Sequence, residues 1–290
     1  MKSSVVSRLY DTVIVSALLA FTAFCVIPFL HIIAGSLTSA VELMNKGFVL
    51  FPTQFSLDAY RYVFSTDTLV RSLGVTVYLT LLGTLLNVVF TALLAYPLSR
   101  KDVAGRQFVL MMVLFTMLFN GGMIPTFLLV KGLGLLNTLW SLMLPGLIGA
   151  FILIILKNFF QQLPEEVEES AKMDGANDLQ ILFKIVVPLS MPAIATISLF
   201  YAVGHWNTFM QAVLYINDSR LWPIQVLLRQ VVMLTAGNIG DSSALGDRIV
   251  PPPQTVKMAV IVVATVPILA VYPFLQKHFV KGAMLGSVKG

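Results

Sequence analysis

Hydrophobic residues fill six long runs of the chain that contain no formally charged residue. Each run is long enough to cross about 30 Å of hydrocarbon as a helix. A Lys, Arg or Asp at the centre of such a helix would cost about 2.5 to 3.5 kcal/mol on insertion, so the charges fall between the runs. The pattern predicts an all-α integral membrane protein with six transmembrane helices, at about residues 12–36, 72–98, 107–130, 138–157, 190–214 and 257–276.

The third and fourth runs lie so close together that their assignment has an alternative. Only Lys131 separates them, within the glycine-rich turn KGLGLLNT. One buried hairpin is the competing interpretation, but about fifty apolar residues are too many for a single span. We therefore expect two spans here, and one transmembrane domain over residues 1–290.

The composition agrees with a lipid environment. The chain of 290 residues is 57% hydrophobic and 11% charged, whereas about 25% of the residues of a soluble protein are charged. So few charged residues cannot give a globule an ordinary wetted surface. The composition therefore excludes a soluble globular protein.

The basic residues indicate the orientation of the chain. An even number of spans places both termini on one side of the membrane. If that side is the cytoplasm, the four cytoplasmic segments hold 11 Lys and Arg residues and the three opposite segments hold 8. Cytoplasmic loops carry the excess of basic residues, so we expect both termini in the cytoplasm. The net charge of +5 is scattered over loop edges without interleaved aromatic residues, so no nucleic-acid partner is predicted.

The motifs of common enzyme classes are missing from the sequence. The chain has no GxxxxGK[ST] phosphate loop, no HExxH, no paired Cys-x-x-Cys and no GxSxG. His31 and His205 lie in different predicted spans, and the single cysteine, Cys25, lies in the first. The spans also lack the ionisable residues that are typical of a proton or ion relay. We expect no catalytic residue, no metal site and no cofactor bound by this chain.

Six of the fourteen acidic residues lie between Glu165 and Asp178, in the longest predicted cytoplasmic loop, residues 159–188. Pro164 followed by glutamates is typical of a helix start. Proline needs no partner for an N–H there, and carboxylates complement the positive end of the helix dipole. Gly175 then predicts a left-handed cap at the end of this helix.

The predicted loop helix presents mostly small side chains on the face that contains Val167, Ala171 and Asp174. A second helix is expected to begin at Asn177 or the residue after it, and to stop or kink at Pro188. Two interpretations of this loop stay open on the residues alone. It is either an amphipathic hairpin that only joins two spans, or a surface that another protein approaches closely.

The segment EESAKMDGANDLQILFKIVVP resembles the E-A-A-x-x-x-G-x(9)-I-x-L-P loop of permease subunits in ATP-binding-cassette importers. The matching positions hold Glu169, Ser170, Ala171, Gly175, Ile185, Val187 and Pro188. Ser170 replaces the first alanine of the motif and Val187 replaces its leucine, and both are mild departures. Seven positions over twenty residues make the match specific.

Three further segments resemble the carbohydrate branch of this family. They are PLSMPAIATISLFYAVGHWNTF, VKGAMLGSVKG and GGMIPTFLLVKGLGLLNTLW. The first contains the Gly-x-Trp-Asn element of the fifth span, and the second is similar to the tail of the second permease of maltose importers. Together they resemble the oligosaccharide and polysaccharide subgroup that includes alginate importers, and the resemblance covers nearly the whole chain.

The resemblance implies a permease subunit in the plasma (inner) membrane of a bacterium, forming half of a translocation path for a carbohydrate. The implied partners are membrane lipid, a second related permease in a heterodimer, two ATPase subunits that bind ATP and Mg, and an extracytoplasmic solute-binding protein. In this family the loop helix docks on an ATPase subunit. Closure of the ATPase dimer on ATP then turns the permease halves from inward-facing to outward-facing.

Three groups of contact residues follow from the resemblance. The residues that couple to the ATPase would be Glu169, Ser170, Ala171, Asp174 and Gly175. Glu169 would form a salt bridge, Ala171 would be seated in a groove of the ATPase, and Gly175 would be the elbow. The tail between the ATPase subunits would be Ser287, Val288, Lys289 and Gly290. The loop that contacts the solute-binding protein would include Asn238, Asp241, Ser242 and Ser243.

The fifth predicted span carries polar side chains at helical spacing. Polar groups are costly in hydrocarbon, so they should face protein or water. Aromatic faces and amides suit a sugar, which has C–H surfaces and many hydroxyl groups. We expect the substrate path to include Tyr201, His205, Trp206, Asn207 and Gln211. The alternative is that Trp206 and Asn207 only pack the helix bundle.

Two other functions remain compatible with the sequence. One is the same class of importer for a solute that is not a sugar. The other is an intramembrane enzyme or assembly factor that uses the acidic loop only for docking. A permease should co-purify with an ATPase and a second six-span protein, whereas an enzyme has no need of them.

Overall fold

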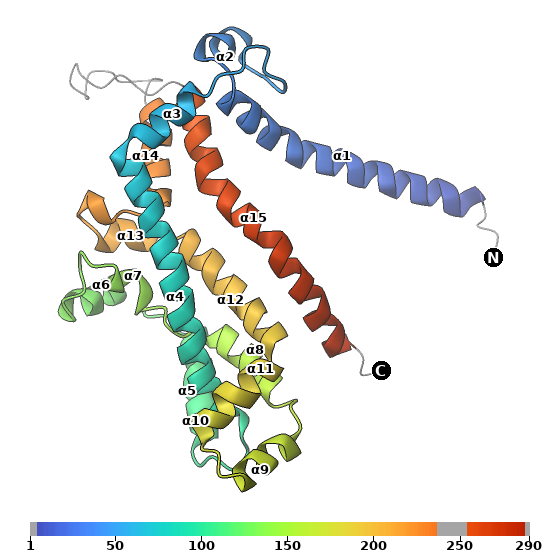
Figure 1. Ribbon diagram of the computed structural model, residues 1–290, viewed down its shortest axis with the longest axis vertical. Coiled ribbons are helices and arrows are strands. Elements are labelled where there is room, and N and C mark those ends of the chain that lie inside the picture. Colours follow the sequence, from blue (N-terminus) through green and yellow to red (C-terminus); the bar gives the residue numbers. More distant parts are fainter. Residues whose placement is uncertain (1–4, 237–253, 288–290) are drawn as a thin grey trace. The chain divides into compact units, whose positions relative to one another are not determined.

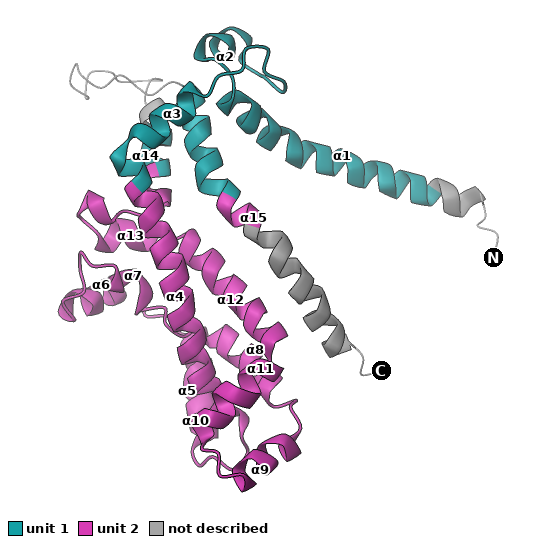
Figure 2. Ribbon diagram, in the orientation of Figure 1, with its two compact units in different colours: residues 1–70, 228–266 teal, residues 71–227, 267–290 magenta. Residues whose placement is uncertain are grey.

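The computed structural model describes residues 5–236 and 254–287, and within these ranges the chain is almost entirely helical (Figure 1). The described part contains no strand, and its β-bridge between Thr38 and Phe55 is isolated. The chain divides into two compact units, residues 1–70 with 228–266 and residues 71–227 with 267–290 (Figure 2). The prediction of an all-α protein is confirmed.

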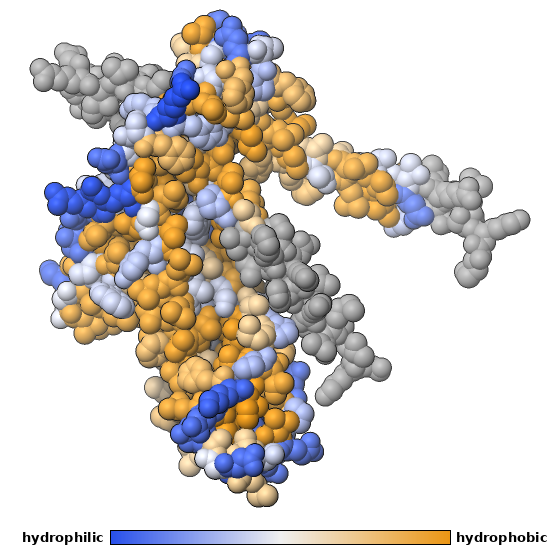
Figure 3. Space-filling model, in the orientation of Figure 1, coloured by the Kyte–Doolittle hydropathy of each residue, from blue (hydrophilic) through white to orange (hydrophobic). Residues whose placement is uncertain are grey.

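The first unit begins with α1, Val5–Ser36, which is long and apolar enough to cross a membrane. Most of its described apolar side chains are exposed (Figure 3), as expected of a helix whose surroundings are lipid or another apolar surface. The unit continues with α2, Ala40–Lys46, and α3, Asp58–Ser65. His31 lies near the end of α1, and its Nδ1 is 2.9 Å from the carbonyl oxygen of Val49. This contact ties α1 to the loop that follows α2.

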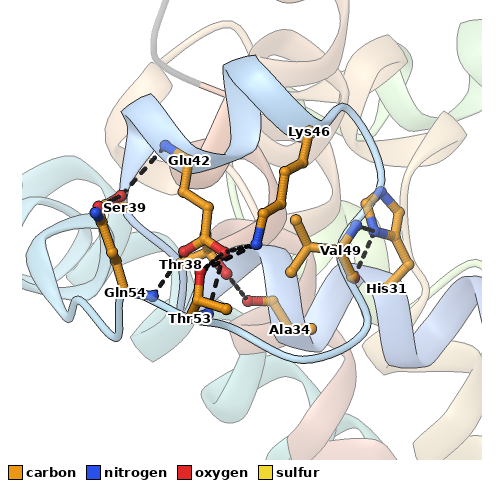
Figure 4. Close-up of polar contacts among 9 residues, drawn as sticks. All are labelled: His31, Ala34, Thr38, Ser39, Glu42, Lys46, Val49, Thr53 and Gln54. Atoms are coloured by element: carbon orange, nitrogen blue, oxygen red, sulfur yellow. Dashed lines mark hydrogen bonds and ion pairs between the residues drawn. The ribbon is translucent and has the colours of Figure 1, made fainter.

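A buried carboxylate organises the segment between α2 and α3. Glu42 is 6% exposed and accepts hydrogen bonds from Lys46 Nζ at 2.8 Å, Thr53 N at 3.0 Å and Gln54 N at 2.7 Å (Figure 4). Ser39 caps α2 by accepting a hydrogen bond from the backbone N–H of Glu42. The Lys46 ammonium and the Thr53 hydroxyl hold the pKa of the Glu42 carboxyl at about 2, below its ordinary value of 4.5.

The second unit starts within α4, Asp67–Ser99, which like α14 and α15 has residues in both units. Short connections join its helices. The remaining elements are α5 (Arg106–Leu118), α6 (Met123–Gly132), α7 (Trp140–Met143), α8 (Ala150–Phe160), α9 (Glu165–Met173), α10 (Asp178–Ile181), a π-helical turn (Leu182–Val186), α11 (Val187–Leu189), α12 (Met191–Trp206), α13 (Met210–Tyr215), a 3-10 turn (Ser219–Leu221), α14 (Ile224–Ala236) and α15 (Gln254–Ser287).

The helix expected at residues 107–130 is broken into α5 and α6, with a bend of 119° between them. The break covers residues 119–122, which include Asn120, Gly121 and Gly122. Gly122 has a φ of 89°, which residues with a β-carbon rarely adopt. Hydropathy alone did not reveal the break, because the flanking residues are equally apolar on both sides.

Two more expected helices are interrupted. Residues 138–157 form α7 and α8, which are separated by LPGLIG, residues 144–149. Residues 190–214 form α12 and α13, and α12 follows α11 after a bend of 88°. Within the described part, α1 and α4 are each long and apolar enough to span a membrane alone, and the two bent helix pairs qualify if each is one span. The count of six spans stays a prediction.

Two apolar clusters hold the second unit together, and α4 contributes to both. One packs the C-terminal half of α4 against α8, α9 and the helices that lead into α12, with Phe160, Ile181 and Ile197 fully buried. The other packs the preceding part of α4 against α6, α7 and α13, with Leu79 and Val130 fully buried. The α4 helix is therefore the common support of this unit.

Replacing the Glu42 carboxylate should change how the stability of the fold depends on pH, because the ionised carboxylate stabilises the fold. Because the pKa of Glu42 is lowered in the folded chain, its contacts stabilise the fold above pH 4.5 and are lost as the pH falls toward about 2. Thermal unfolding of Glu42→Gln should therefore occur below the wild-type temperature at pH 7, and this difference should narrow as the pH falls. Asp58→Asn is the control, because the Asp58–Arg61 pair is exposed. If the unfolding temperatures of wild type and Glu42→Gln differed by the same amount at every pH, the stabilising role of the ionised Glu42 carboxylate would be contradicted.

Candidate functional site

The second unit contains a cavity of about 580 Å³ between α4, the α5–α6 connection, the α7–α8 segment, α12 and α13. None of the lining residues is an Asp, Glu, Lys or Arg. Amide, hydroxyl and imidazole groups come from Asn87, Asn120, Ser141, His205, Thr208 and Gln211. Aromatic rings come from Phe119, Phe200, Tyr201 and Tyr215. The cavity can therefore offer hydrogen bonds and flat apolar faces, but no formal charge from an acidic or a strongly basic side chain.

Asn87 in α4 connects three elements around the cavity. Its Nδ2 donates to the carbonyl oxygens of Gly146 at 2.8 Å and Leu147 at 2.9 Å, in the connection that precedes α8. Its Oδ1 lies 2.6 Å from His205 Nε2 in α12. An amide oxygen only accepts, so Nε2 of His205 carries the proton in this contact. One buried side chain thus holds the non-helical connection and α12 to α4.

Tyr201 makes a second link one helical turn away. Its hydroxyl lies 2.8 Å from Thr91 Oγ1 and accepts a hydrogen bond from the backbone N–H of Gly149 at 3.0 Å. On α4 the contacts advance from Asn87 to Thr91, and on α12 they go back from His205 to Tyr201. The two helices therefore run antiparallel and are joined by two polar contacts on one face of each.

Gly83 allows the close approach of these two helices. A β-carbon placed on Gly83 would lie 2.5 Å from His205 Nε2, whereas real β-carbons essentially never come within 3.0 Å of another heavy atom. The imidazole ring therefore occupies the space that a side chain at this position would need. Glycine is required at position 83 for packing and not for a special backbone angle.

The structure places three of the five expected path residues at the cavity. Tyr201, His205 and Gln211 line it, and Trp206 and Asn207 do not. Trp206 is 5% exposed, so it lies within the packed part of the unit. The Nδ2 of Asn207 donates to the carbonyl oxygen of Val203 in its own helix at 2.8 Å.

The polar residues that other elements bring to the site were not predicted from the sequence, although the sequence of α4 carried a signal for them. Its polar side chains recur at helical spacing through an otherwise apolar run, at Ser72, Thr76, Thr80, Thr84, Asn87 and Thr91. Such spacing predicts a face turned away from lipid. Asn120 and Ser141 had no comparable signal. Asn120 lies in the break between α5 and α6, and Ser141 lies in α7, the short helix before the break that precedes α8.

The acidic loop has the helix, glycine elbow and second helix that the sequence predicts. The first helix is α9, and Gly175 follows it with a φ of 84°. Asn177 then caps α10, and its backbone N–H and side chain both bond to Gln180 in a capping box. The chain bends after Leu189, next to the predicted stop at Pro188.

The exposed face of α9 differs from the expected one. Glu169, Ser170 and Asp174 are exposed, but Ala171 is 9% exposed and belongs to the apolar cluster beneath α9. Ala171 therefore packs within its own chain in this structure. The side that is open to a partner carries Glu169 and the other exposed acids of the helix.

Glu168, to which the sequence analysis gave no role, is buried at 5% exposure. Its carboxylate accepts hydrogen bonds from Arg100 Nη2 and from the Tyr96 hydroxyl at 3.3 Å. Burial raises the pKa of the Glu168 carboxyl, and the Arg100 charge acts in the opposite direction. Arg100 follows the last residue of α4, so this contact joins α4 to α9.

Part of the predicted contact set lies outside the described residues. This holds for Asn238, Asp241, Ser242, Ser243, Val288, Lys289 and Gly290. Ser287 is the last residue of α15. Among the described residues, no three His, Cys, Asp or Glu side chains are grouped so that they could hold a metal ion.

Comparisons with known proteins agree with the helical membrane architecture. Residues 106–284 match the family described as the binding-protein-dependent transport system inner membrane component. A polygalacturonan/rhamnogalacturonan transport system permease protein of Bacillus subtilis is 61% identical, over 98% of this chain and 99% of its own. An arabinooligosaccharides transport system permease protein of Halalkalibacterium halodurans is 28% identical, over 93% of this chain and 94% of its own.

A solved structure has the same fold. It is a chain of a bacterial ABC transporter involved in the import of the acidic polysaccharide alginate, with a TM-score of 0.86 and 31% identity, over 95% of this chain and 98% of that one. The present chain belongs to the family of binding-protein-dependent transport system inner membrane components. It is a multi-pass membrane permease subunit of an ATP-binding-cassette importer, and such a subunit works with a partner permease, an ATPase and a binding protein.

Gly83→Ala should destabilise the unit by forcing the His205 ring from its place. Overpacking of this kind costs about 1 to 3 kcal/mol, so the unfolding temperature in detergent should fall. Gly74→Ala, in the same helix, is the matched control, because a β-carbon there meets nothing within 4 Å. The cost of Gly83→Ala should shrink in a His205→Ala background, where the clash is absent. An equal cost in both backgrounds would show that His205 does not fill this space.

Proposed function

We propose that this chain forms half of the translocation path for an oligosaccharide or polysaccharide in an ATP-driven importer. The observation that carries the proposal is the uncharged polar and aromatic cavity between α4, α12 and α13. Sugar hydroxyls pair with amide and hydroxyl groups, and the C–H faces of the rings pack on aromatic side chains. The carbohydrate substrates named for the similar permeases support this class of cargo.

Within the path, Gln211 is the residue best placed to meet the substrate, because it lines the cavity and is exposed. Thr208 also lines the cavity, but it is 9% exposed and its hydroxyl donates to the carbonyl oxygen of Gly204 at 3.3 Å. Tyr201 and His205 also line the cavity, but the Tyr201 hydroxyl is already bonded to α4 and to the α7–α8 connection, and the Nε2 of His205 is already bonded to α4. These two residues therefore shape the wall, and Gln211 supplies an amide that can bond to a sugar.

We propose that α9 is the part of this chain that docks on an ATPase subunit. Its exposed carboxylates, with Glu169 the expected ion-pairing residue, suit a basic groove. In this arrangement the loop of residues 159–188 and both termini face the cytoplasm, and the chain crosses the membrane six times. ATP and Mg would be bound by the two ATPase subunits, with the tail of residues 287–290 between them. The segment that contains residues 238–243 would meet the extracytoplasmic binding protein.

Affinity purification of the chain from its native membrane tests the proposed partnership. The expected result is a complex with a second six-span permease and an ATPase, at two ATPase copies for each permease pair. Charge reversal of Glu169 to Lys should remove the ATPase and leave the partner permease bound, because the acidic docking face is altered while the spans are not. Recovery of the chain without an ATPase from every detergent and lipid nanodisc tested would favour an intramembrane enzyme or assembly factor instead.

Uptake by the reconstituted complex tests the path. Gln211→Ala should raise the KM for the loaded binding protein or slow uptake by a factor equivalent to about 0.5 to 1.5 kcal/mol, the usual cost of one lost hydrogen bond. Asn207→Ala is the matched control, since Asn207 lies outside the cavity and bonds within its own helix. Loss of uptake in the control with normal uptake by Gln211→Ala would place the path elsewhere. Comparison of an oligosaccharide with a non-sugar solute in the same assay tests the class of cargo.

A further inference from the structure

The contact between α4 and α9 is formed by a buried charge pair in a polar setting. The side chains of Arg100 and Glu168 are 15% and 7% exposed, and the residues are 68 positions apart in the chain. Tyr96, one turn before Arg100, donates its hydroxyl to the same carboxylate at 3.3 Å and stacks its ring under the guanidinium at 4.9 Å. The three groups therefore form one cluster that belongs to both helices.

The geometry of this cluster differs from that of the neighbouring surface pair. Lys101 and Glu165 approach to 4.0 Å, but their side chains are 83% and 73% exposed. An exposed pair of this kind contributes little, because water and salt screen it. Breaking a buried pair by removing one partner leaves an uncompensated charge, and this is strongly destabilising for the arrangement. Both pairs join a basic residue that follows α4 to a glutamate of α9, but their exposures predict opposite consequences when one partner is removed.

The α9 helix has two different sides at this junction. Glu168 and Ala171, three residues apart, face its own chain. Glu169 faces outward and is exposed. A partner that displaces α9 from its outer side would therefore act on the rest of the chain through Ala171, which is small and apolar, and Glu168, which is charged. An apolar contact alone lets a helix slide or rotate, whereas a charge-assisted hydrogen bond to a planar guanidinium also fixes direction.

The middle of α4 reaches the cavity. Asn87 lies thirteen residues before Arg100, which is about 20 Å along a helix at 1.5 Å per residue. Between them α4 is one helix with Pro97 in its last turn, and its Thr91 and Asn87 hold Tyr201, His205 and the α7–α8 connection. A displacement of the Arg100 end of α4 would therefore be carried to the wall of the cavity.

We propose that Arg100 and Glu168, supported by Tyr96, are positioning residues that pass the movement of α9 to α4 and so to the cavity wall. The proposal rests on the proposed function, in which α9 docks on the ATPase. Arg100 Nε is buried and has no hydrogen-bond partner in the described part of the chain. It gives the carboxylate an alternative to Tyr96, so the charge pair persists when α9 shifts by a small amount.

The proposal is tested by measuring uptake per ATP hydrolysed. The complete complex is reconstituted in liposomes and supplied with the loaded binding protein. Glu168→Gln and Arg100→Gln should assemble and hydrolyse ATP, but uptake per ATP hydrolysed should fall by about tenfold, within the range of coupling between distant sites. Lys101→Gln is the control, because Lys101 lies outside α9 and its pair with Glu165 is exposed, so this variant should couple as wild type does. Normal coupling in Glu168→Gln, or an equal loss in Lys101→Gln, would overturn the proposal.

A conservative variant covers the case in which the neutral variants fail to assemble. Arg100→Lys keeps the charge but loses the planar fork and the stacking on Tyr96. Reduced uptake per ATP with normal assembly of this variant supports the role in coupling, and unchanged coupling rejects it. If wild type itself neither binds an ATPase nor transports, the proposed function fails. If wild type transports and all variants couple normally, only the present inference fails.

Discussion

Hydrocarbon offers no hydrogen-bond partner and an unpaired polar group there costs several kcal/mol, so the polar side chains of α4 and α12 are constrained to pair inside the protein. Thr80 and Thr84 of α4 are exceptions in the described structure, because their buried hydroxyls have no partner there. Asn87 with His205 and Thr91 with Tyr201 satisfy one another across the two helices. The Nδ2 of Asn87 donates hydrogen bonds to the carbonyl oxygens of Gly146 and Leu147, which lie in the break before α8. The same contacts that hold the helices together thus permit the break, and the break opens the cavity.

The α4 helix links this polar core to the cytoplasmic loop of the proposed arrangement. The middle of α4 carries the contacts that shape the cavity, and Arg100, which follows the last residue of α4, lies beside α9. Apolar packing along both parts keeps the helix in place, but it is non-directional. The directional contacts lie at the two places where α4 meets an element that is proposed to touch substrate or ATPase. A long helix with specific contacts at both places is suited to transmit a displacement.

Glu42 and Glu168 show how surroundings set the behaviour of a buried carboxylate. Glu42 receives a lysine and several N–H and O–H donors, and these contacts lower its pKa to about 2. Glu168 has Arg100 and Tyr96, but burial is the larger effect and raises its pKa. The first carboxylate organises a loop next to α1, where its local partners lie within twelve residues. The second depends on a helix that lies far away in the sequence, so only folding assembles its site.

The sequence by itself determined the membrane class, the mostly helical architecture and the local design of the acidic loop, with its helix start, its glycine at positive φ and its Asn177 cap. These features depend on composition and on residues within one or two helical turns. Tertiary structure decided that Ala171 and Glu168 face inward and Glu169 outward, since neighbouring residues point about 100° apart and only packing selects the buried side. It also decided where apolar runs break and that Asn87 meets His205, 118 positions away. Hydropathy averages over residues that are neighbours in sequence, so it cannot show which helices pack together. These contacts join residues that are far apart in sequence and depend on that packing.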